Sequence, residues 1–246
     1  MKLLTFLLLI NSAFSYGFSL KDYEKKIKST SSIKTVVEKL TKEEVENSLR
    51  DFIANSRPSR VVGSIGHEKS EKYIEEKFKE LKSSNTIFEI HEFGPDVVSA
   101  GKLYEDDFNR EILAKVSPND PNYRKWKDFT VSMLNSLNEI KNIKGKNYIW
   151  EKKGNKNPND IILVVANYDT LNHDPKTMKV DMKSSMPGAD NNGTGVAMIL
   201  SMAKIFNQLD LPKTIRLVLL DVEEFGFLGS KAYVENLKQF KIELRS

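Results

Sequence analysis

The sequence predicts an α/β domain, and three segments carry that prediction. The run IILVVA (Ile161–Ala166) is apolar and mostly β-branched or Leu, which is typical of a strand buried on both faces of a parallel sheet. The run TIRLVLLD (Thr214–Asp221) has the same character. Between them, apolar residues recur at helical spacing over Asn192–Asn207. A length of 246 residues suits one such domain, or one domain with a leading arm.

The other elements are expected from capping and turn signals. Thr41, with Glu44 three residues later, matches a capping box, so a helix is expected to start there and to reach about Asn55. Pro and Gly residues mark a loop over 57–66. The further elements expected are an amphipathic helix at 67–82, strands at 86–93 and 146–152, a turn at 154–160, helices at 123–140 and 231–240, and the start of a strand at 241–244.

The chain divides into a leader, a lead-in and the α/β domain. Residues 1–15 combine one lysine, an apolar run and a small-x-small cleavage pattern, which predicts a signal peptide and an exported protein. The apolar run is far shorter than the roughly 20 residues that span a bilayer, so no stable membrane anchor is expected. Residues 16–56 are read as a helical lead-in and 57–246 as the α/β domain, interrupted by an insertion at 94–145.

Composition limits the partners and the kinds of metal site. The net charge of +4 arises from 38 basic and 34 acidic residues in mixture, which indicates a solvated surface and no nucleic-acid partner. The chain has no cysteine, so a thiolate metal site is excluded and any metal must be held by His, Asp or Glu. No pattern indicates the oligomeric state.

Acidic and amide side chains stand where the predicted strands meet loops. Residues two apart on a strand point to one face, so Asn167 and Asp169 are expected to emerge together at a carboxyl end, where open α/β sheets bind ligands. Asp190 lies in the Gly-rich stretch PGADNNGTG, just before a helix. Glu223 and Glu224 follow the second strand and point in different directions. One of them can hold a metal while the other serves as general base on a water whose pKa the metal lowers toward about 7.

These motifs, in this order, resemble the exported zinc aminopeptidases of peptidase family M28. The resemblance implies a three-layer sandwich around a central mixed, mostly parallel sheet of the phosphorylase/hydrolase-like type, with two zinc ions and peptide substrates. It implies that Asp190 bridges the metals, that Glu224 is a ligand of one zinc, that Glu223 is the general base and that Asp169 orients a ligand histidine. The matching segments are RVVGSIGHEKSEKYIEEKFKEL, VVANYDT, PGADNNGTGVAMIL and LVLLDVEEFGFLGSKAYVENL.

The chain departs from the family pattern in two ways. The family has a histidine ligand where this chain has Asn167, and a neutral amide oxygen is a poor zinc ligand beside imidazole. The amide nitrogen of Asn167 can still donate to Asp169. The family also takes a further carboxylate and a last histidine from beyond the position of Ser246. The chain is therefore expected to be the N-terminal portion of the catalytic domain, incomplete at its C-terminus, with one zinc ion or none.

Three functions stay open at this point. The first is a zinc-dependent exopeptidase that hydrolyses N-terminal peptide bonds through a metal-activated water. The second is a catalytically inactive or truncated homologue. The third is a one-zinc acyltransferase like the glutaminyl cyclases, distant relatives that do not need the first histidine. None of the histidines present is expected to replace that ligand: His67 is read as a capping or surface residue, His91 as structural and His173 as a solvated loop residue.

Overall fold

The computed structural model describes residue 35 and residues 38–239, and residues 40–239 lie in one compact unit. The predicted signal peptide and the strand start expected at 241–244 lie outside the described residues. The helices are α4 (Lys42–Asn55), α5 (Ile65–Glu80), α6 (Val97–Asp107), α7 (Pro121–Ile140), α8 (Thr194–Asn207) and α9 (Leu228–Gln239), with π-helical turns η1 (Phe108–Leu113) and η2 (Ala189–Gly193). The strands are β1 (Thr86–Phe93), β2 (Gly145–Lys152), β3 (Asn157–Asn167) and β4 (Lys213–Leu220).

The described strands form one mixed sheet in the order β1-β2-β4-β3. β3 pairs in parallel with β4, and Asn167 at the end of β3 lies beside Leu220 at the end of β4. β2 is antiparallel to both of its neighbours, so β1, β3 and β4 all run in the same direction. The expected mixed sheet is confirmed, although two of its three described pairings are antiparallel. Because β3 and β4 end at the same edge, the residues that follow the two strands are brought together there.

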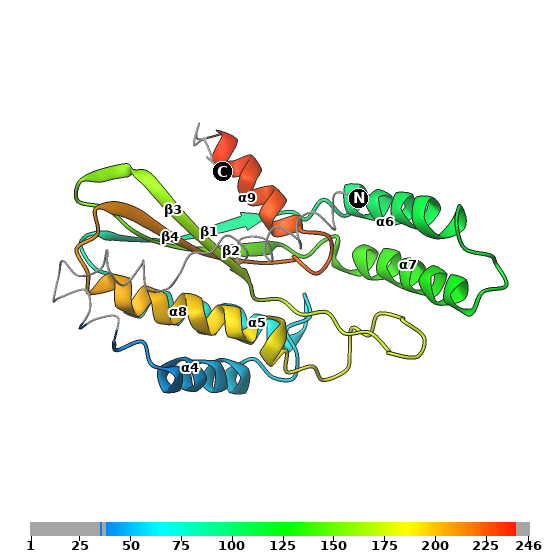
Figure 1. Cartoon of the computed structure of the whole chain (residues 1–246), viewed down its shortest axis with the longest axis horizontal. Helices are drawn as coiled ribbons and strands as arrows, with labels where there is room; N and C mark the ends of the chain where they lie inside the picture. The colour runs from blue at the N-terminus through cyan, green and yellow to red at the C-terminus, as the bar shows by residue number, and fades with distance from the viewer. Residues whose placement is uncertain (1–34, 36–37, 240–246) are drawn as a thin grey trace, which may run out of the picture. The chain divides into compact units, whose positions relative to one another are not determined.

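Helices cover both faces of the sheet (Figure 1). α5 and α8 pack on one face with α4 outside them, and α9 packs on the other face across β1 and β2. The larger core lies under α5 and α8 and contains Tyr148, Trp150 and Leu217, all fully buried. A smaller core under α9 contains Val218 and Tyr233. Each large apolar side chain buried in this way stabilises the fold by about 1.5–3 kcal/mol, and together they hold the three layers in place.

The capping signals place two helix starts. The Thr41 hydroxyl oxygen accepts a hydrogen bond from the Glu44 backbone N–H at 3.1 Å, which confirms the predicted start of α4. Helix α5 starts earlier than expected, at Ile65. The reason is a cap inside the predicted loop, since the Ser64 hydroxyl accepts from the backbone N–H of His67 at 3.2 Å.

Strand β3 differs from the sequence-based expectation in burial and in length. It is one of the two edge strands of the described sheet, and Ile162 and Val165 are 47% and 49% exposed. The interpretation of IILVVA as buried on both faces is wrong, although the strand itself is confirmed. β3 also begins at Asn157, inside the turn expected at 154–160. The central strand β4 is buried as expected.

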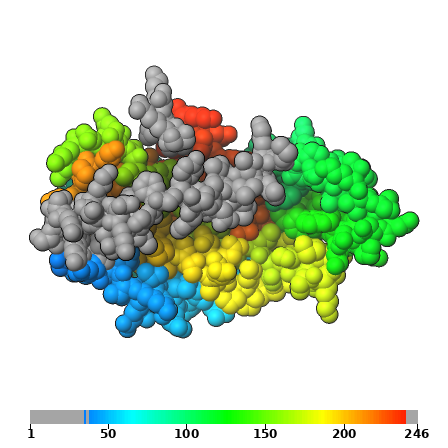
Figure 2. Space-filling view, in the orientation of Figure 1, coloured from blue at the N-terminus to red at the C-terminus, as the bar shows by residue number. Residues whose placement is uncertain are grey.

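The insertion at 94–145 is a pair of packed helices, of which the sequence predicted only α7. Helix α6 is capped by Asp96, whose carboxylate accepts from the Ser99 backbone N–H at 3.0 Å. In Figures 1 and 2 the two helices, coloured green, lie together at one end of the sheet. Ala100 and Leu137 share a core with Phe225, which belongs to the loop after β4. The insertion therefore packs directly against the loop that carries Glu223 and Glu224.

None of the described helices combines the length and the apolar character needed to cross a membrane.

A substitution of Gly66, near the start of α5, tests how tightly this helix packs on the preceding loop. A Cβ at this position would lie 2.0 Å from the carbonyl oxygen of Ser59, which is backbone and cannot swing away. We expect Gly66→Ala to lower the free energy of unfolding by about 1–3 kcal/mol, the usual cost of overpacking. Gly94→Ala is the matched control, because no atom lies within 4 Å of the added methyl group. Urea denaturation of both variants measures the difference, and equal stabilities would contradict this packing.

Candidate active site

The loop ends of β3 and β4 meet around the carboxylate of Asp169, which is fully buried. One of its oxygens accepts the backbone N–H of Glu224 at 3.0 Å, and the other lies 3.4 Å from the amide nitrogen of Asn167. The expectation that Asn167 donates to Asp169 agrees with this arrangement. Burial raises the pKa of Asp169 to about 8, helped by the nearby Asp221 and opposed by the Glu224 N–H. Asp169 thus ties the end of β3 to the loop after β4.

A chain of side-chain amides connects the turn η2 to both strand ends. The Asn192 amide nitrogen donates to the amide oxygen of Asn167 at 2.8 Å. The Asn191 amide nitrogen donates to a carboxylate oxygen of Glu224, also at 2.8 Å. Asp190 precedes these two asparagines in the same turn and its side chain is exposed. The turn that carries Asp190 is therefore held against both Asn167 and Glu224.

Glu223 is partly buried and points toward the start of α9. Its carboxylate oxygen accepts the backbone N–H of Ser230 at 2.6 Å, in the first turn of that helix. Burial raises the pKa of Glu223 to about 7, while the hydrogen bonds from Ser230 act in the opposite direction. A carboxyl group with such a pKa is suited to general acid–base catalysis near neutral pH.

These groups line one open cleft of about 600 Å³. Its polar side is formed by Asn167, Asn191, Asn192, Glu223 and Glu224, and its apolar side by Val165, Ala166, Leu220, Gly226 and Phe227. Tyr104 of helix α6 also lines it, so the insertion contributes a side chain. Burial and the Glu224 carboxylate raise the pKa of Tyr104 to about 12, so its phenol is neutral at ordinary pH. Of the predicted site residues, the cleft contains Asn167, Glu223 and Glu224; Asp169 lies beneath it and Asp190 lies on the neighbouring turn.

Arg60 is a positioning residue that the sequence analysis did not single out. Its buried guanidinium donates to four backbone carbonyls, those of Tyr168 at 2.6 Å, Pro187 at 2.6 Å, Gly188 at 2.8 Å and Asn191 at 3.5 Å. These carbonyls belong to the end of β3 and to the Gly-rich stretch. Burial lowers the pKa of Arg60 to about 10, and the negative charge of Asp169 opposes that change. Arg60 therefore holds the Gly-rich stretch against β3. Its place inside the conspicuous segment RVVGSIG was the only available signal.

His67 is the second residue that the sequence analysis misjudged. The expectation of a surface residue is wrong for its side chain, which is buried and has Nε2 2.8 Å from a carboxylate oxygen of Asp221. The backbone N–H of Lys146 donates to the other Asp221 oxygen at 3.0 Å, and the imidazole stacks on Tyr168. Burial alone would lower the pKa of His67, but Asp221 raises it above its ordinary value. The pair fixes Asp221 directly before the loop that carries Glu223.

The donors at the cleft fit a zinc site only in part. Asp190 has an exposed carboxylate, and Glu224 accepts a hydrogen bond through only one of its two oxygens in the contacts described above. Carboxylate oxygens of this kind are ordinary zinc ligands. Asn167 does not fit, because its amide oxygen already accepts from Asn192 and is a poor zinc ligand beside imidazole. With Asn167 engaged, the predicted ligands that remain are Glu224 in the cleft and Asp190 on the neighbouring turn.

A second group of possible metal ligands lies outside the cleft. Over residues 38–239, the one set of three His, Asp or Glu side chains with ligand atoms within 4.8 Å of one another is His67, Glu71 and Asp221. These atoms already have partners: Lys146 Nζ lies 2.7 Å from Glu71, and His67 is bonded to Asp221. We assign this set to a buried ion-pair network and not to a metal centre.

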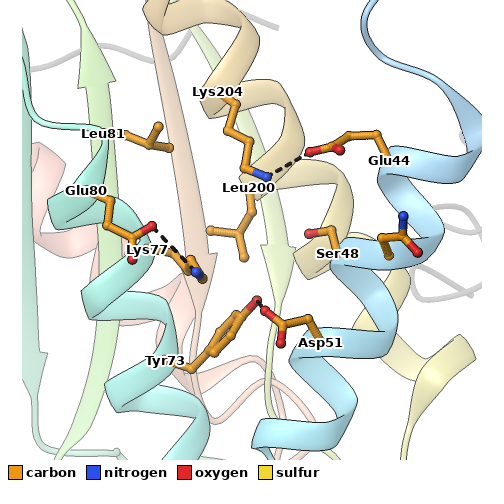
Figure 3. Close-up of a pocket in the computed structure, with 10 residues that line it drawn as sticks. Glu44, Ser48, Asp51, Tyr73, Lys77, Glu80, Leu81, Leu200 and Lys204 are labelled. Carbon is orange, nitrogen blue, oxygen red and sulfur yellow. Dashed lines mark hydrogen bonds and ion pairs between the residues drawn. The ribbon is translucent and has the colours of Figure 1, made fainter.

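A second hollow of about 290 Å³ lies between α4, α5 and α8, away from the strand ends (Figure 3). Lys204 of α8 pairs with Glu44 of α4 at 2.8 Å, and Lys77 pairs with Glu80 along α5 at 3.5 Å. The Tyr73 hydroxyl donates to Asp51 at 2.6 Å. Because these groups satisfy one another, this hollow offers less to a ligand than the cleft does.

The chain is similar in sequence to a known protein family and to several characterised proteins. The model for peptidase family M28 matches residues 147–245. Aminopeptidase YwaD of Bacillus subtilis is 33% identical over 95 residues, which are 39% of this chain and 18% of that protein. A probable zinc metalloprotease of Pyrenophora tritici-repentis is 30% identical over 92 residues, 37% of this chain and 20% of that protein. The matched part thus spans about a fifth of these curated relatives.

Solved structures share the fold at low sequence identity. LapB from Legionella pneumophila has a TM-score of 0.56 at 15% identity, covering 87% of this chain and 44% of that one. An Acidobacteriales bacterium glutaminyl cyclase has a TM-score of 0.51 at 19% identity, covering 81% and 54%. At these identities the likeness shows the fold alone, so it does not separate peptidase from cyclase. The family match, the aminopeptidase relatives and the motifs at the strand ends agree with one another. Residues 147–245 of this chain thus match the model of peptidase family M28 and are similar to parts of its aminopeptidases.

Proposed function

We propose that the cleft is the active site of a zinc-dependent exopeptidase of the aminopeptidase type, which removes residues from the N-terminus of peptides. The observation that carries this proposal is the position of Glu223. This carboxyl group, with a pKa of about 7, lines the same cleft as Glu224. Glu224 in turn is bonded to the turn that holds Asp190. The turn that carries Asp190 thus contacts Glu224 in the cleft that Glu223 also lines, and this contact supports the proposal.

In this proposal each side chain has one role. Asp190 and Glu224 hold zinc, which supplies a Lewis acid for the scissile carbonyl and lowers the pKa of a coordinated water. Glu223 takes a proton from the attacking water and returns it to the leaving amine. Asp169, through Asn167 and the Glu224 backbone N–H, keeps the two strand ends in register with each other.

The test is hydrolysis of leucine 4-nitroanilide by the full chain supplied with zinc. We expect release of nitroaniline that stops when a chelator is added and resumes with excess zinc. N-acetyl-leucine 4-nitroanilide is the matched control, since it differs only in its blocked amine and should not be cleaved. Absence of hydrolysis by a folded, zinc-supplied chain would reject the proposal.

The second candidate is a non-catalytic homologue. It is favoured by one observation, the hydrogen bond from Asn192 that occupies the amide oxygen of Asn167. A chain without activity in the assay above, but with a cooperative thermal transition, supports this candidate.

We also propose that the protein is exported by means of a signal peptide at residues 1–15. An intact mass that retains these residues in secreted material would contradict this proposal.

A further inference from the structure

The insertion contributes one polar side chain to the cleft, that of Tyr104. Its ring is held on the α7 side by Phe129, edge-on at 6.4 Å, and Phe129 meets Trp126 edge-on at 5.9 Å. On the other side, a Cβ at Gly226 would lie 3.8 Å from the ring edge, so the loop after β4 packs close to it. Tyr104 is therefore fixed between the insertion and the loop that carries the two glutamates. It lies outside the matched segment 147–245.

The hydrogen-bond donors of the cleft are almost all in use. The amide nitrogen of Asn191 donates to Glu224, that of Asn192 donates to Asn167, and that of Asn167 faces Asp169. Among the described side chains that line the cleft, the Tyr104 hydroxyl is the one donor without a protein partner. The carboxylates of the two glutamates are acceptors, so neither can donate a hydrogen bond to the carbonyl oxygen of a ligand.

We propose that Tyr104 binds the substrate by donating a hydrogen bond to the carbonyl oxygen of its N-terminal residue. The insertion thereby contributes a substrate-binding side chain to the cleft. This inference rests on the proposed function for the identity of the ligand. Zinc held by the carboxylates would polarise this carbonyl from one side of the cleft, and the Tyr104 hydroxyl would donate a hydrogen bond to it from the α6 side. The apolar wall formed by Leu220 and Phe227 lies beside the bound side chain.

Binding of two matched ligands to the full chain with zinc tests the proposal by calorimetry. The methyl ketone of leucine has the ammonium group, isobutyl group and carbonyl oxygen of an N-terminal leucine, but no bond to hydrolyse. The second ligand, 3-methylbutylamine, lacks the carbonyl. We expect Tyr104→Phe to weaken ketone binding about 3- to 10-fold, the usual value of one hydrogen bond, and to leave binding of the amine unchanged.

Tyr123→Phe is the control, since Tyr123 lies in the same insertion, packs on Phe108 and does not line the cleft. It should change neither affinity. Tyr104→Phe removes one oxygen without a protein partner, so its thermal midpoint should match that of the wild type. The proposal is overturned if Tyr104→Phe leaves ketone binding intact, if it weakens both ligands equally, or if the wild type binds neither. Binding does not require turnover, so a chain that binds the ketone through Tyr104 but hydrolyses nothing rejects only the proposed function.

Discussion

Glu223→Gln is expected to lower kcat for leucine 4-nitroanilide by about 10²- to 10⁴-fold, the usual contribution of a general base. Glutamine keeps the size of the side chain and an oxygen that can accept the Ser230 backbone N–H, but it cannot take a proton from water. The loss should therefore appear in kcat with little change in KM. The measurement is steady-state kinetics over a range of substrate concentrations.

Glu235→Gln is the matched control for that experiment. Glu235 is exposed on α9, and the substitution removes the same charge without touching the cleft. Its kinetics and thermal midpoint should equal those of the wild type. Retention of full activity by Glu223→Gln would remove Glu223 from the mechanism.

The second large effect is expected on stability, at the buried pair of His67 and Asp221. Removing one partner of a buried ion pair leaves an uncompensated charge and typically costs about 3–5 kcal/mol. We expect Asp221→Ala to lower the free energy of unfolding by this amount in urea denaturation. The exposed pair of Asp160 and Lys213, 3.4 Å apart, gives the comparison, because Asp160→Ala should cost no more than about 1 kcal/mol.

A double-mutant cycle separates the pair from other losses at the same residues. The His67→Ala, Asp221→Ala double variant should be less destabilised than the sum of the two single variants, since each single change leaves the other group unpaired. Additive effects would mean that the two side chains do not interact in the folded protein.

The same pair should make stability depend on pH. The pKa of His67 is raised from 6.5, so its contribution is fully present below 6.5 and is lost as the pH rises through the folded-state value. Burial raises the pKa of Asp221, but His67, the Lys146 backbone N–H and Tyr168 together lower it below 3.8, so its contribution is present above 3.8 and is lost as the pH falls through the folded-state value. The difference in unfolding free energy between the wild type and His67→Gln should therefore be largest from about pH 4 to 6.5 and should shrink toward pH 9. A difference that grows with pH would contradict the pairing.

Local patterns predicted most of the fold because they act within a few residues. The Thr41 cap places α4, and periodicity places β1, β4 and α8 within a few residues of their observed bounds. The burial of β3 was misjudged because composition does not say which strand is outermost. Helix α6 was missed because its first turn lies in a stretch that Gly94 and Pro95 mark as a loop, and its cap at Asp96 has no glutamate partner three residues later.

The sequence predicted those residues of the candidate site that follow the ends of strands β3 and β4. The contact between Asn167 and Asp169 follows from the two-residue repeat of a strand. Arg60, His67 and Tyr104 could not be placed, because each lies beside residues more than 100 positions away in the chain. Pairings of that kind depend on how the layers pack and leave no local spacing signal.

The central claim is that the cation belongs at the strand-end cleft, beside Glu223. Crystals of the full chain soaked with zinc, and measured for anomalous scattering at the zinc edge, test it directly. We predict a zinc peak within bonding distance of Asp190 and Glu224, and none at His67, Glu71 and Asp221. A peak only at the buried triad, or none at the cleft with zinc in excess, would contradict the account.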